Sequence, residues 1–356
     1  RKNQAGENLN DSNIQTETKT ISVDQKIFQG FEGVNSIKKS KLESKQAISN
    51  LKRVEQDTLL SSIKSYYDLV YKIKLKQFNS ENVDLFERQV ESDSARLQKG
   101  EITLTDLAQS ESSLAGAGAD LISAETDLIT TKANFERITR VAVPKDFKES
   151  AKLKLKLPNS LLESLKISEL NNPKLIIAKL DYEIAKKDVS IKKAKLSPSA
   201  SINYSKSENT DFSSAVDKID QETLKATVSW PIISGGKNYS TLKKSKFQKE
   251  KSNLILQDVK NEVKTDTANA WSVYQSSKSV LKATKSQLEA AEIANEGITL
   301  EYDSGDQRTT LDVIQSRTFL LSAKINNAKA ERDFVISQFK LLDVLGNLTL
   351  KYLQNI

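Results

Sequence analysis

The stretch that decides the fold is TLKATVSWPIISGG, residues 223–236. In its first eight residues, apolar side chains at 224, 226, 228 and 230 alternate with polar ones at 223, 225, 227 and 229. A period of two predicts a β-strand with one apolar and one polar face. Two glycines follow, and from residue 237 to 303 the chain contains no proline. The sequence therefore predicts a strand that leads through a tight turn into one very long helix.

The same pattern occurs a second time, about 205 residues earlier in the chain. The motif KKSK stands at residues 38–41 and again at 243–246, and DLAQS at 106–110 corresponds to DVIQS at 312–316. The offset grows by one between these landmarks, which implies one inserted residue near Asp306. Landmarks in the same order over such a distance indicate a tandem duplication.

Each repeat is expected to contain a long outgoing helix and a shorter return helix. Apolar and small residues recur seven apart, which is typical of coiled-coil packing. At about 1.5 Å per residue each outgoing helix would measure roughly 100 Å, so we expect an elongated molecule. Glycine supplies the left-handed conformation that ends a helix at a turn. The predicted helices and turns are 34–98, Gly100 and 103–140 in the first repeat, and 237–303, Gly305 and 309–346 in the second.

The fold class is therefore mostly α with a small β part, consisting of long helical hairpins in tandem repeat plus two β-hairpins. We divide the chain into a first repeat (1–140), an irregular equatorial belt (141–172), a second repeat (173–350) and a C-terminal tail (351–356). The belt is expected to hold one short helix at about 160–170, and the second repeat to open with a helix at 174–196.

The predicted strands are short. In the second repeat, strands at 201–205 and 223–230 are expected to be joined by a polar loop at about 207–222. In the first repeat, a strand at 20–24 corresponds to the second of these. Its hairpin partner is expected at or before residues 1–5, and a short partner helix before residue 1.

The composition argues against several classes of protein. Cysteine and histidine are both absent, which removes the thiol nucleophile, the commonest general base and the commonest metal ligands. We therefore expect no enzyme, no cofactor and no metal site. The net charge is +7, but the basic residues alternate with acidic ones, as on a solvated helix surface, and we expect no nucleic-acid partner.

The half-apolar strands pose a physical problem. An exposed sheet with an apolar face and open edges aggregates. In a bilayer such a sheet must close into a barrel, because lipid offers no partners for backbone groups. Known barrels need at least about eight strands, so the four expected per chain are too few. Several chains would have to pool their strands.

The chain resembles the TolC-like outer-membrane efflux proteins. The resemblance covers essentially the whole chain and rests on ordered motifs at residues 230–236, 302–305, 308–313, 323–324 and 342–346. It implies a homotrimer with a 12-stranded outer-membrane barrel, to which each chain gives four strands, continued by an α-helical barrel in the periplasm. It also implies outer-membrane lipid, an inner-membrane transporter and a periplasmic adaptor as partners, in an efflux pump or type I secretion system.

The resemblance further implies a gate at the periplasmic tip of the tunnel. Arg308 matches the arginine that constricts the tunnel in that family, and Thr105, Asp106 and Tyr302 match its hydrogen-bonding and ion-pairing partners. An arginine fork on a carboxylate is directional and can be broken by a partner protein.

The resemblance also implies a ring of carboxylates in the lumen. Asp312 matches a ring-forming acid, and three copies at a constriction would favour cations. Gln315 stands where the family has a second ring acid. We therefore expect cation selectivity to be weaker here.

Other interpretations remain open. Asp106 and Asp312 follow turns, where an aspartate often caps a helix, and Arg308 is also consistent with an ordinary surface arginine. The chain as a whole is also compatible with a soluble periplasmic coiled-coil structural or adaptor protein without a pore. That alternative leaves the two-faced strands before each long helix unexplained.

Overall fold

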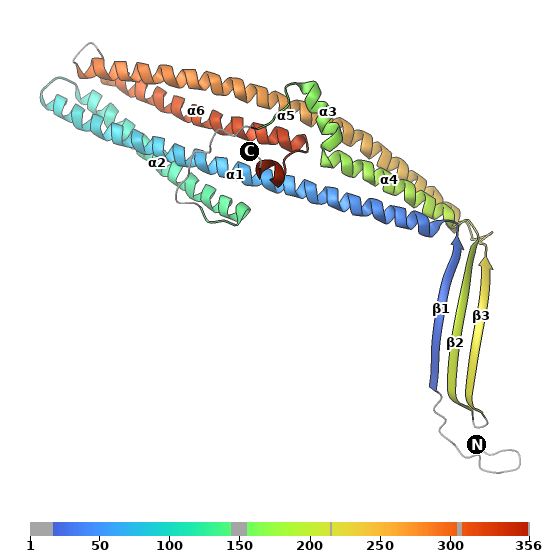
Figure 1. Cartoon of the computed structure of the whole chain (residues 1–356). Coiled ribbons are helices and arrows are strands. Elements are labelled where there is room, and N and C mark those ends of the chain that lie inside the picture. Colours follow the sequence, from blue (N-terminus) through green and yellow to red (C-terminus); the bar gives the residue numbers. More distant parts are fainter. Residues whose placement is uncertain (1–16, 144–154, 214–215, 305–307, 355–356) are drawn as a thin grey trace. The chain divides into compact units, whose positions relative to one another are not determined.

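The computed structural model describes residues 17–143, 155–213, 216–304 and 308–354 (Figure 1). Its elements are β1 (Glu17–Gln29), α1 (Glu32–Gln98), α2 (Leu104–Thr139), α3 (Leu161–Asn171), α4 (Pro173–Ala194), β2 (Ser199–Ser213), β3 (Val216–Ser229), α5 (Lys237–Asp303), α6 (Thr310–Val344) and α7 (Leu350–Gln354). The chain divides into two compact units, described separately below. The strand unit comprises residues 1–47 and 178–257, and the helical unit comprises residues 48–177 and 258–356.

The strand unit contains an antiparallel sheet in the order β1-β2-β3. Val23 on β1 lies opposite Tyr204 on β2, which lies opposite Leu224 on β3. Side chains two apart on a strand share a face, so these three form one apolar row. The next row, on the opposite face, is polar: Asn203 donates to Asp24 at 2.6 Å and pairs with Lys225 in register. The sheet thus has one apolar and one polar face.

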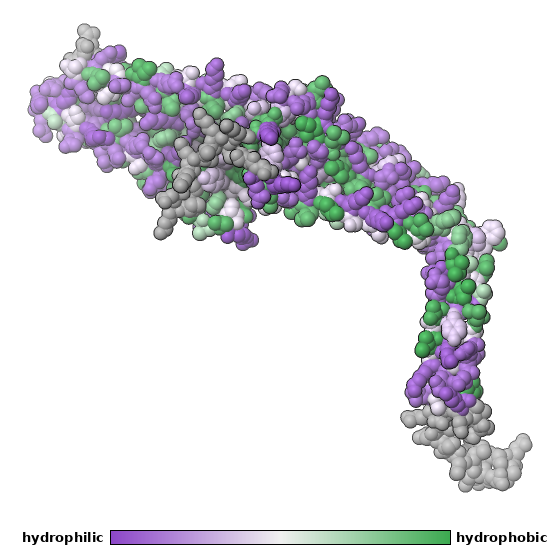
Figure 2. Space-filling view, in the orientation of Figure 1, coloured by the Kyte–Doolittle hydropathy of each residue, from purple (hydrophilic) through white to green (hydrophobic). Residues whose placement is uncertain are grey.

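The apolar face is strongly exposed in the single chain. Leu224 is 74% exposed, Val228 77% and Ile21 71%. In Figure 2 apolar residues gather over the end of the sheet where β1 ends, and polar residues lie toward the opposite end. At that polar end Lys206 and Glu222, on neighbouring strands, form an ion pair of 2.8 Å.

The predicted polar loop at about 207–222 is wrong. Residues 207–213 and 216–222 continue both strands, with Ser207 opposite Gln221 and Asn209 opposite Ile219. The alternation of apolar and polar residues fades there, but the backbone ladder continues because charged side chains such as Glu208 and Lys218 pair across it. The strand predicted at 20–24 is likewise longer, as β1, and it pairs with β2. Its expected partner at residues 1–5 lies outside the described residues.

The helical unit is held together by several small clusters of buried side chains. Leu69 of α1 packs with Leu128 and Phe135 of α2. Ala270 of α5 packs with Leu341 of α6 and its neighbours. Figure 1 shows α1 alongside α2 and α5 alongside α6. Each hairpin therefore has a core of its own.

The two hairpins of the helical unit are joined by ion pairs between α1 and α6. Lys74 pairs with Glu331 at 3.1 Å, and Lys324 pairs with Glu81 at 3.7 Å. A third cluster, around Phe339, Leu342 and Leu348, packs against Leu59 and neighbouring residues of α1. The contact between α1 and α6 is therefore apolar near the end of α6, around Leu342, and includes ion pairs at Lys324 and Glu331.

The predicted helices are confirmed, with ends displaced by at most two residues. The helix predicted at 237–303 coincides with α5, and those predicted at 34–98 and 309–346 correspond to α1 and α6. Helix α7 was not predicted, and it lies mostly in the predicted C-terminal tail. The hydroxyl of Tyr352 in α7 donates to the carbonyl of Lys156 and accepts from the N–H of the same residue. No local sequence pattern predicts contacts between residues so far apart in the chain.

The two compact units each combine segments from both predicted repeats. The division of the chain into repeats, belt and tail therefore stays a prediction. In the described part of the chain, no helix combines the length and the apolar character needed to cross a membrane.

Candidate functional site

The hairpin tip between α1 and α2 is a tight glycine turn. Gly100 has a φ of 74°, which any side chain would strain, and its N–H donates to Leu97 O at 2.9 Å. Glu101 N–H donates to Arg96 O at 3.0 Å, which satisfies a carbonyl at the end of α1. The turn predicted at Gly100 is confirmed. The corresponding Gly305, with the inserted residue near 306, lies outside the described residues.

Asp106 and Asp312 cap the two return helices in the same way. Thr103 N–H donates to Asp106 Oδ2 at 2.9 Å, and Thr309 N–H donates to Asp312 Oδ2 at 2.9 Å. Each threonine hydroxyl in turn accepts from the aspartate's backbone N–H, which completes a capping box. The capping interpretation of both acids is therefore confirmed.

The caps also fix the charge of both acids. For Asp106 and Asp312 alike, hydrogen bonds from the backbone N–H of the threonine, and then from its hydroxyl, lower the pKa of the carboxyl group. Both side chains are partly exposed, and Thr105 and Gln315 beside them are exposed. A capping carboxylate at the tip remains available to ions in solution.

Within one chain, Arg308 pairs with an acid of its own hairpin. Its Nε donates to Glu301 Oε2 at 2.6 Å, and both side chains are close to half exposed. Thr105 and Asp106 lie on the other hairpin, where Asp106 bonds to Thr103. Contacts of Arg308 with its expected partners in an assembly stay a prediction.

Tyr302 lies in a buried, polar environment at the end of α5. It is 4% exposed, and its hydroxyl donates to Asp93 Oδ1 at 2.7 Å. The guanidinium of Arg96 lies 4.3 Å from the centre of its ring and donates to its carbonyl oxygen at 3.5 Å. Burial raises the pKa of the Tyr302 hydroxyl. The end of α5 is thus gripped by the last turns of α1.

Asp93 was not predicted from the sequence as a site residue. Its side chain is fully buried, and Ser110 of α2 donates to it at 2.5 Å. Gln89, one turn earlier on α1, donates at 2.9 Å. A signal for it exists in the sequence, because Asp93 continues the 3–4 spacing of the buried positions Phe86 and Gln89. An acid on the core-facing stripe of a helix needs buried partners.

A second charge, which is only partly buried, approaches from α6. Arg317 donates to the backbone carbonyl of Leu85 on α1 at 3.1 Å. Burial lowers the pKa of its guanidinium, an effect opposed by the charges of Asp303 and Asp93. Polar groups of all four long helices therefore meet just behind the tip.

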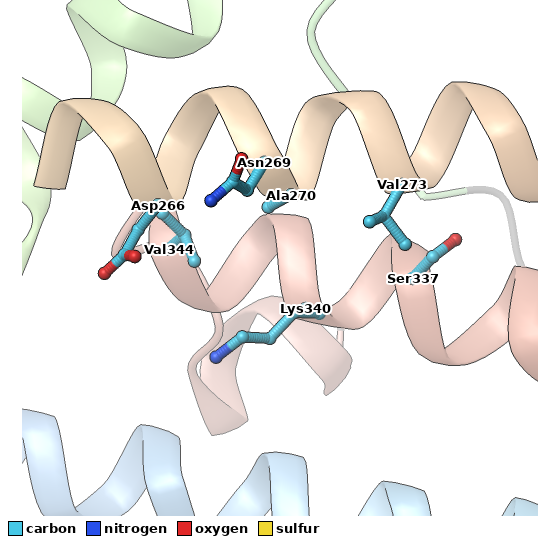
Figure 3. Close-up of a pocket in the computed structure, with 7 residues that line it drawn as sticks. All are labelled: Asp266, Asn269, Ala270, Val273, Ser337, Lys340 and Val344. Atoms are coloured by element: carbon cyan, nitrogen blue, oxygen red, sulfur yellow. The ribbon is translucent and has the colours of Figure 1, made fainter. Parts of the chain in front are cut away.

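A separate hollow of about 290 Å³ lies between α5 and α6. Figure 3 shows its lining, in which Asp266 from α5 and Lys340 from α6 carry the charges and Val273 and Val344 are apolar. Lys340 is hydrogen-bonded to Asp343 at 2.8 Å. The described residues contain no group of three or more acidic side chains arranged to hold a metal ion. The hollow lies where α5 and α6 pack together, and it is separate from the buried hydrogen bonds of Asp93 near the tip.

The chain is similar to known proteins along most of its length. The sequence profile described as "Outer membrane efflux protein" matches residues 1–139 and 165–347. Outer membrane efflux protein BepC of Brucella suis biovar 1 is 28% identical over 336 residues, covering 94% of this chain and 73% of BepC. Outer membrane protein TolC of Vibrio cholerae serotype O1 is 22% identical over 339 residues, covering 92% of this chain and 76% of TolC.

Solved structures share the fold at lower sequence identity. The structure of CusC superposes with a TM-score of 0.81 at 14% identity, covering 93% of this chain and 83% of CusC. The open-state structure of the Neisseria gonorrhoeae MtrE outer membrane channel gives a TM-score of 0.77 at 15% identity, covering 94% of this chain and 81% of MtrE. With a two-faced sheet, long helical hairpins and a profile match over most of its residues, this chain belongs to the outer membrane efflux protein family.

Proposed function

We propose that three copies of this chain form an exit duct through the bacterial outer membrane. The observation that carries the proposal is the two-faced sheet. Its exposed apolar row, Val23, Tyr204 and Leu224, fits lipid, and its polar face around Asn203 fits a water-filled lumen. The described sheet has three strands, so only pooling between chains could close a barrel. The predicted fourth strand of each chain lies outside the described residues.

In this proposal the helices continue the duct into the periplasm. The chain itself carries no catalytic step. A periplasmic adaptor and an inner-membrane transporter would open the helical tip and supply the energy, in an efflux pump or a type I secretion system. Family membership supports the outer-membrane location of the duct, since the related proteins BepC and TolC are named as outer membrane proteins.

The proposal is tested by locating and reconstituting the protein. Expressed with an outer-membrane targeting signal, the protein should fractionate with the outer membrane as a trimer. The purified trimer should form ion-conducting channels in planar bilayers. Recovery as a soluble protein without channel activity would instead support the periplasmic coiled-coil alternative.

Replacing Arg308 is expected to open the tip. In the closed trimer we propose that Arg308 contacts the exposed Thr105 or the capping Asp106, and these contacts would draw the tips together. The variant Arg308→Ser should therefore raise the single-channel conductance several-fold in planar bilayers. Arg53→Ser is a matched control, because Arg53 is a half-exposed arginine in a weak 3.9 Å pair on α1. Equal conductance of both variants and the wild type would refute the gate assignment.

Replacing Asp312 is expected to weaken cation preference. Three Asp312 carboxylates at the constriction would attract cations, and Asp312→Asn removes all three charges. The reversal potential in a salt gradient should move toward zero in this variant. It should stay unchanged in Asp258→Asn, which alters an exposed acid of α5.

The pH dependence of the same measurement has a definite sign. Because hydrogen bonds from Thr309 lower the pKa of Asp312, the carboxylate stays ionised at pH values where an ordinary aspartate is protonated. Cation preference should therefore persist on acidification and disappear only as the pH falls through the lowered pKa. Loss of preference already above the ordinary aspartate range would contradict a role of Asp312.

A further inference from the structure

We infer that Asp93 is a lock inside each chain, which holds the closed tip by gripping Tyr302 and acts independently of Arg308. The inference rests on the proposed duct and specifies how its tip is regulated. It assigns a role to a residue that the gate expected from the sequence does not include.

Asp93 lies at the centre of a buried hydrogen-bond cluster. Its carboxylate is fully buried and accepts three hydrogen bonds, from Gln89 of its own helix, Ser110 of α2 and Tyr302 of α5. The Tyr302 hydroxyl also lies 3.0 Å from Thr310 Oγ1, at the start of α6. A single carboxylate therefore joins the tips of both helical hairpins.

Separating the two hairpins would break this cluster. Moving α5 away from α1 would withdraw Tyr302 and leave Asp93 with Gln89 and Ser110 as partners, both from the other hairpin. A buried charge that loses a hydrogen bond is strongly destabilised until water reaches it. The closed arrangement is favoured for as long as the site stays dry.

Arg96 strengthens the same grip from the other side. Its guanidinium covers the Tyr302 ring at 4.3 Å, donates to the Tyr302 carbonyl at 3.5 Å and pairs with Glu101 at 3.3 Å. A cation over an aromatic ring adds attraction between α1 and α5. Residues of α1 thus contact the ring, the carbonyl oxygen and the hydroxyl of Tyr302.

The Asp93 cluster and Arg308 lie in different environments. Arg308 is exposed and pairs with Glu301, whereas the Asp93 cluster is buried, with Asp93 and Ser110 at 0%, Thr310 at 2% and Tyr302 at 4% exposure. The hydrogen bonds that join this cluster run among Asp93, Gln89, Ser110, Tyr302 and Thr310. Sites without shared partners act additively, and sites in direct contact do not.

The experiment measures single-channel conductance of the full-length trimer in planar bilayers. Asp93→Leu removes the acceptor while roughly filling its space, and Tyr302→Phe removes only the hydroxyl. Each is expected to raise the conductance several-fold, and the double variant to raise it no further than the larger single effect. Combined with Arg308→Ser, either variant should multiply the conductance by its own factor. Glu91→Leu, at an exposed acid two residues from Asp93, is the matched control and should leave conductance unchanged.

Each outcome bears on the inference. Wild-type conductance of a folded Asp93→Leu trimer would overturn it, and so would multiplying effects of Asp93→Leu and Tyr302→Phe. If Asp93→Leu fails to assemble, Asp93→Asn and Tyr302→Phe decide, because wild-type conductance of both would likewise overturn the lock. A wild-type protein that forms no channels would refute the duct itself, and the lock with it. Wild-type channels with unresponsive Asp93 variants would refute the lock alone.

Discussion

Replacing Leu224 with arginine is expected to remove the protein from the outer-membrane fraction, and the same replacement at Thr223 is expected to leave it there. Leu224 lies in the apolar row with Tyr204 and Val23, and it is 74% exposed in the single chain. An arginine on the lipid face of a barrel costs about 2–4 kcal/mol near the middle of the bilayer. Each trimer would carry three such residues.

Thr223 provides the control because it is the next residue on the same strand. Neighbouring side chains of a strand point to opposite faces, so an arginine at 223 would face the lumen. The measurement is the fraction of protein recovered from the outer membrane as a trimer. Equal recovery of Leu224→Arg and Thr223→Arg would show that the apolar row does not face lipid.

Replacing Gly346 with alanine is expected to lower the free energy of unfolding by about 2–5 kcal/mol, the sum of a left-handed backbone penalty and overpacking. Gly346 has a φ of 74° and ends α6, with its N–H bonded to Asp343 O at 2.9 Å. A Cβ there would lie 2.2 Å from the backbone oxygen of Asn171. Neither backbone can move freely, because Asn172 is tied to Val344 O by a 2.8 Å hydrogen bond.

Gly116→Ala is the matched control for this effect. Gly116 lies inside α2, and a Cβ on it would meet no atom within 4 Å. Alanine in a helix is favoured over glycine by about 0.5–1 kcal/mol, so this variant should be slightly more stable. Unfolding followed by far-ultraviolet circular dichroism measures both changes. A Gly346→Ala protein as stable as Gly116→Ala would show that the contact with Asn171 relaxes without cost.

The helices could be predicted closely because their signals are local. The predicted range 237–303 coincides with α5, in which proline is absent and the buried residues Val263 and Ala270 stand seven apart. The caps are equally local, since Thr103 and Asp106 lie within one turn of each other. The same pattern recurs at Thr309 and Asp312. Periodicity and capping act over a few residues, so one sequence contains them in full.

The predicted polar loop shows where local reasoning ends. Residues 207–222 lack clear alternation, and only the pairing of β2 with β3 decides that 207–213 and 216–222 are strand. The ladder is stabilised there by hydrogen bonds and by ion pairs such as Lys206 with Glu222, which connect positions on different strands. The apolar segments of β2 and β3 could be predicted from the sequence, whereas the full length of each strand depends on its pairing with the other.

The sequence by itself determined the helix lengths, the turn at Gly100, both capping boxes and the two-faced character of the strands. The tertiary structure alone decided what Tyr302 contacts. Its partner Asp93 is 209 residues away in sequence, and the third member of the cluster, Ser110, comes from another helix again. A hydrogen bond depends on the distance between two atoms, and the packing of four helices sets that distance, whereas periodicity and capping are properties of a single segment.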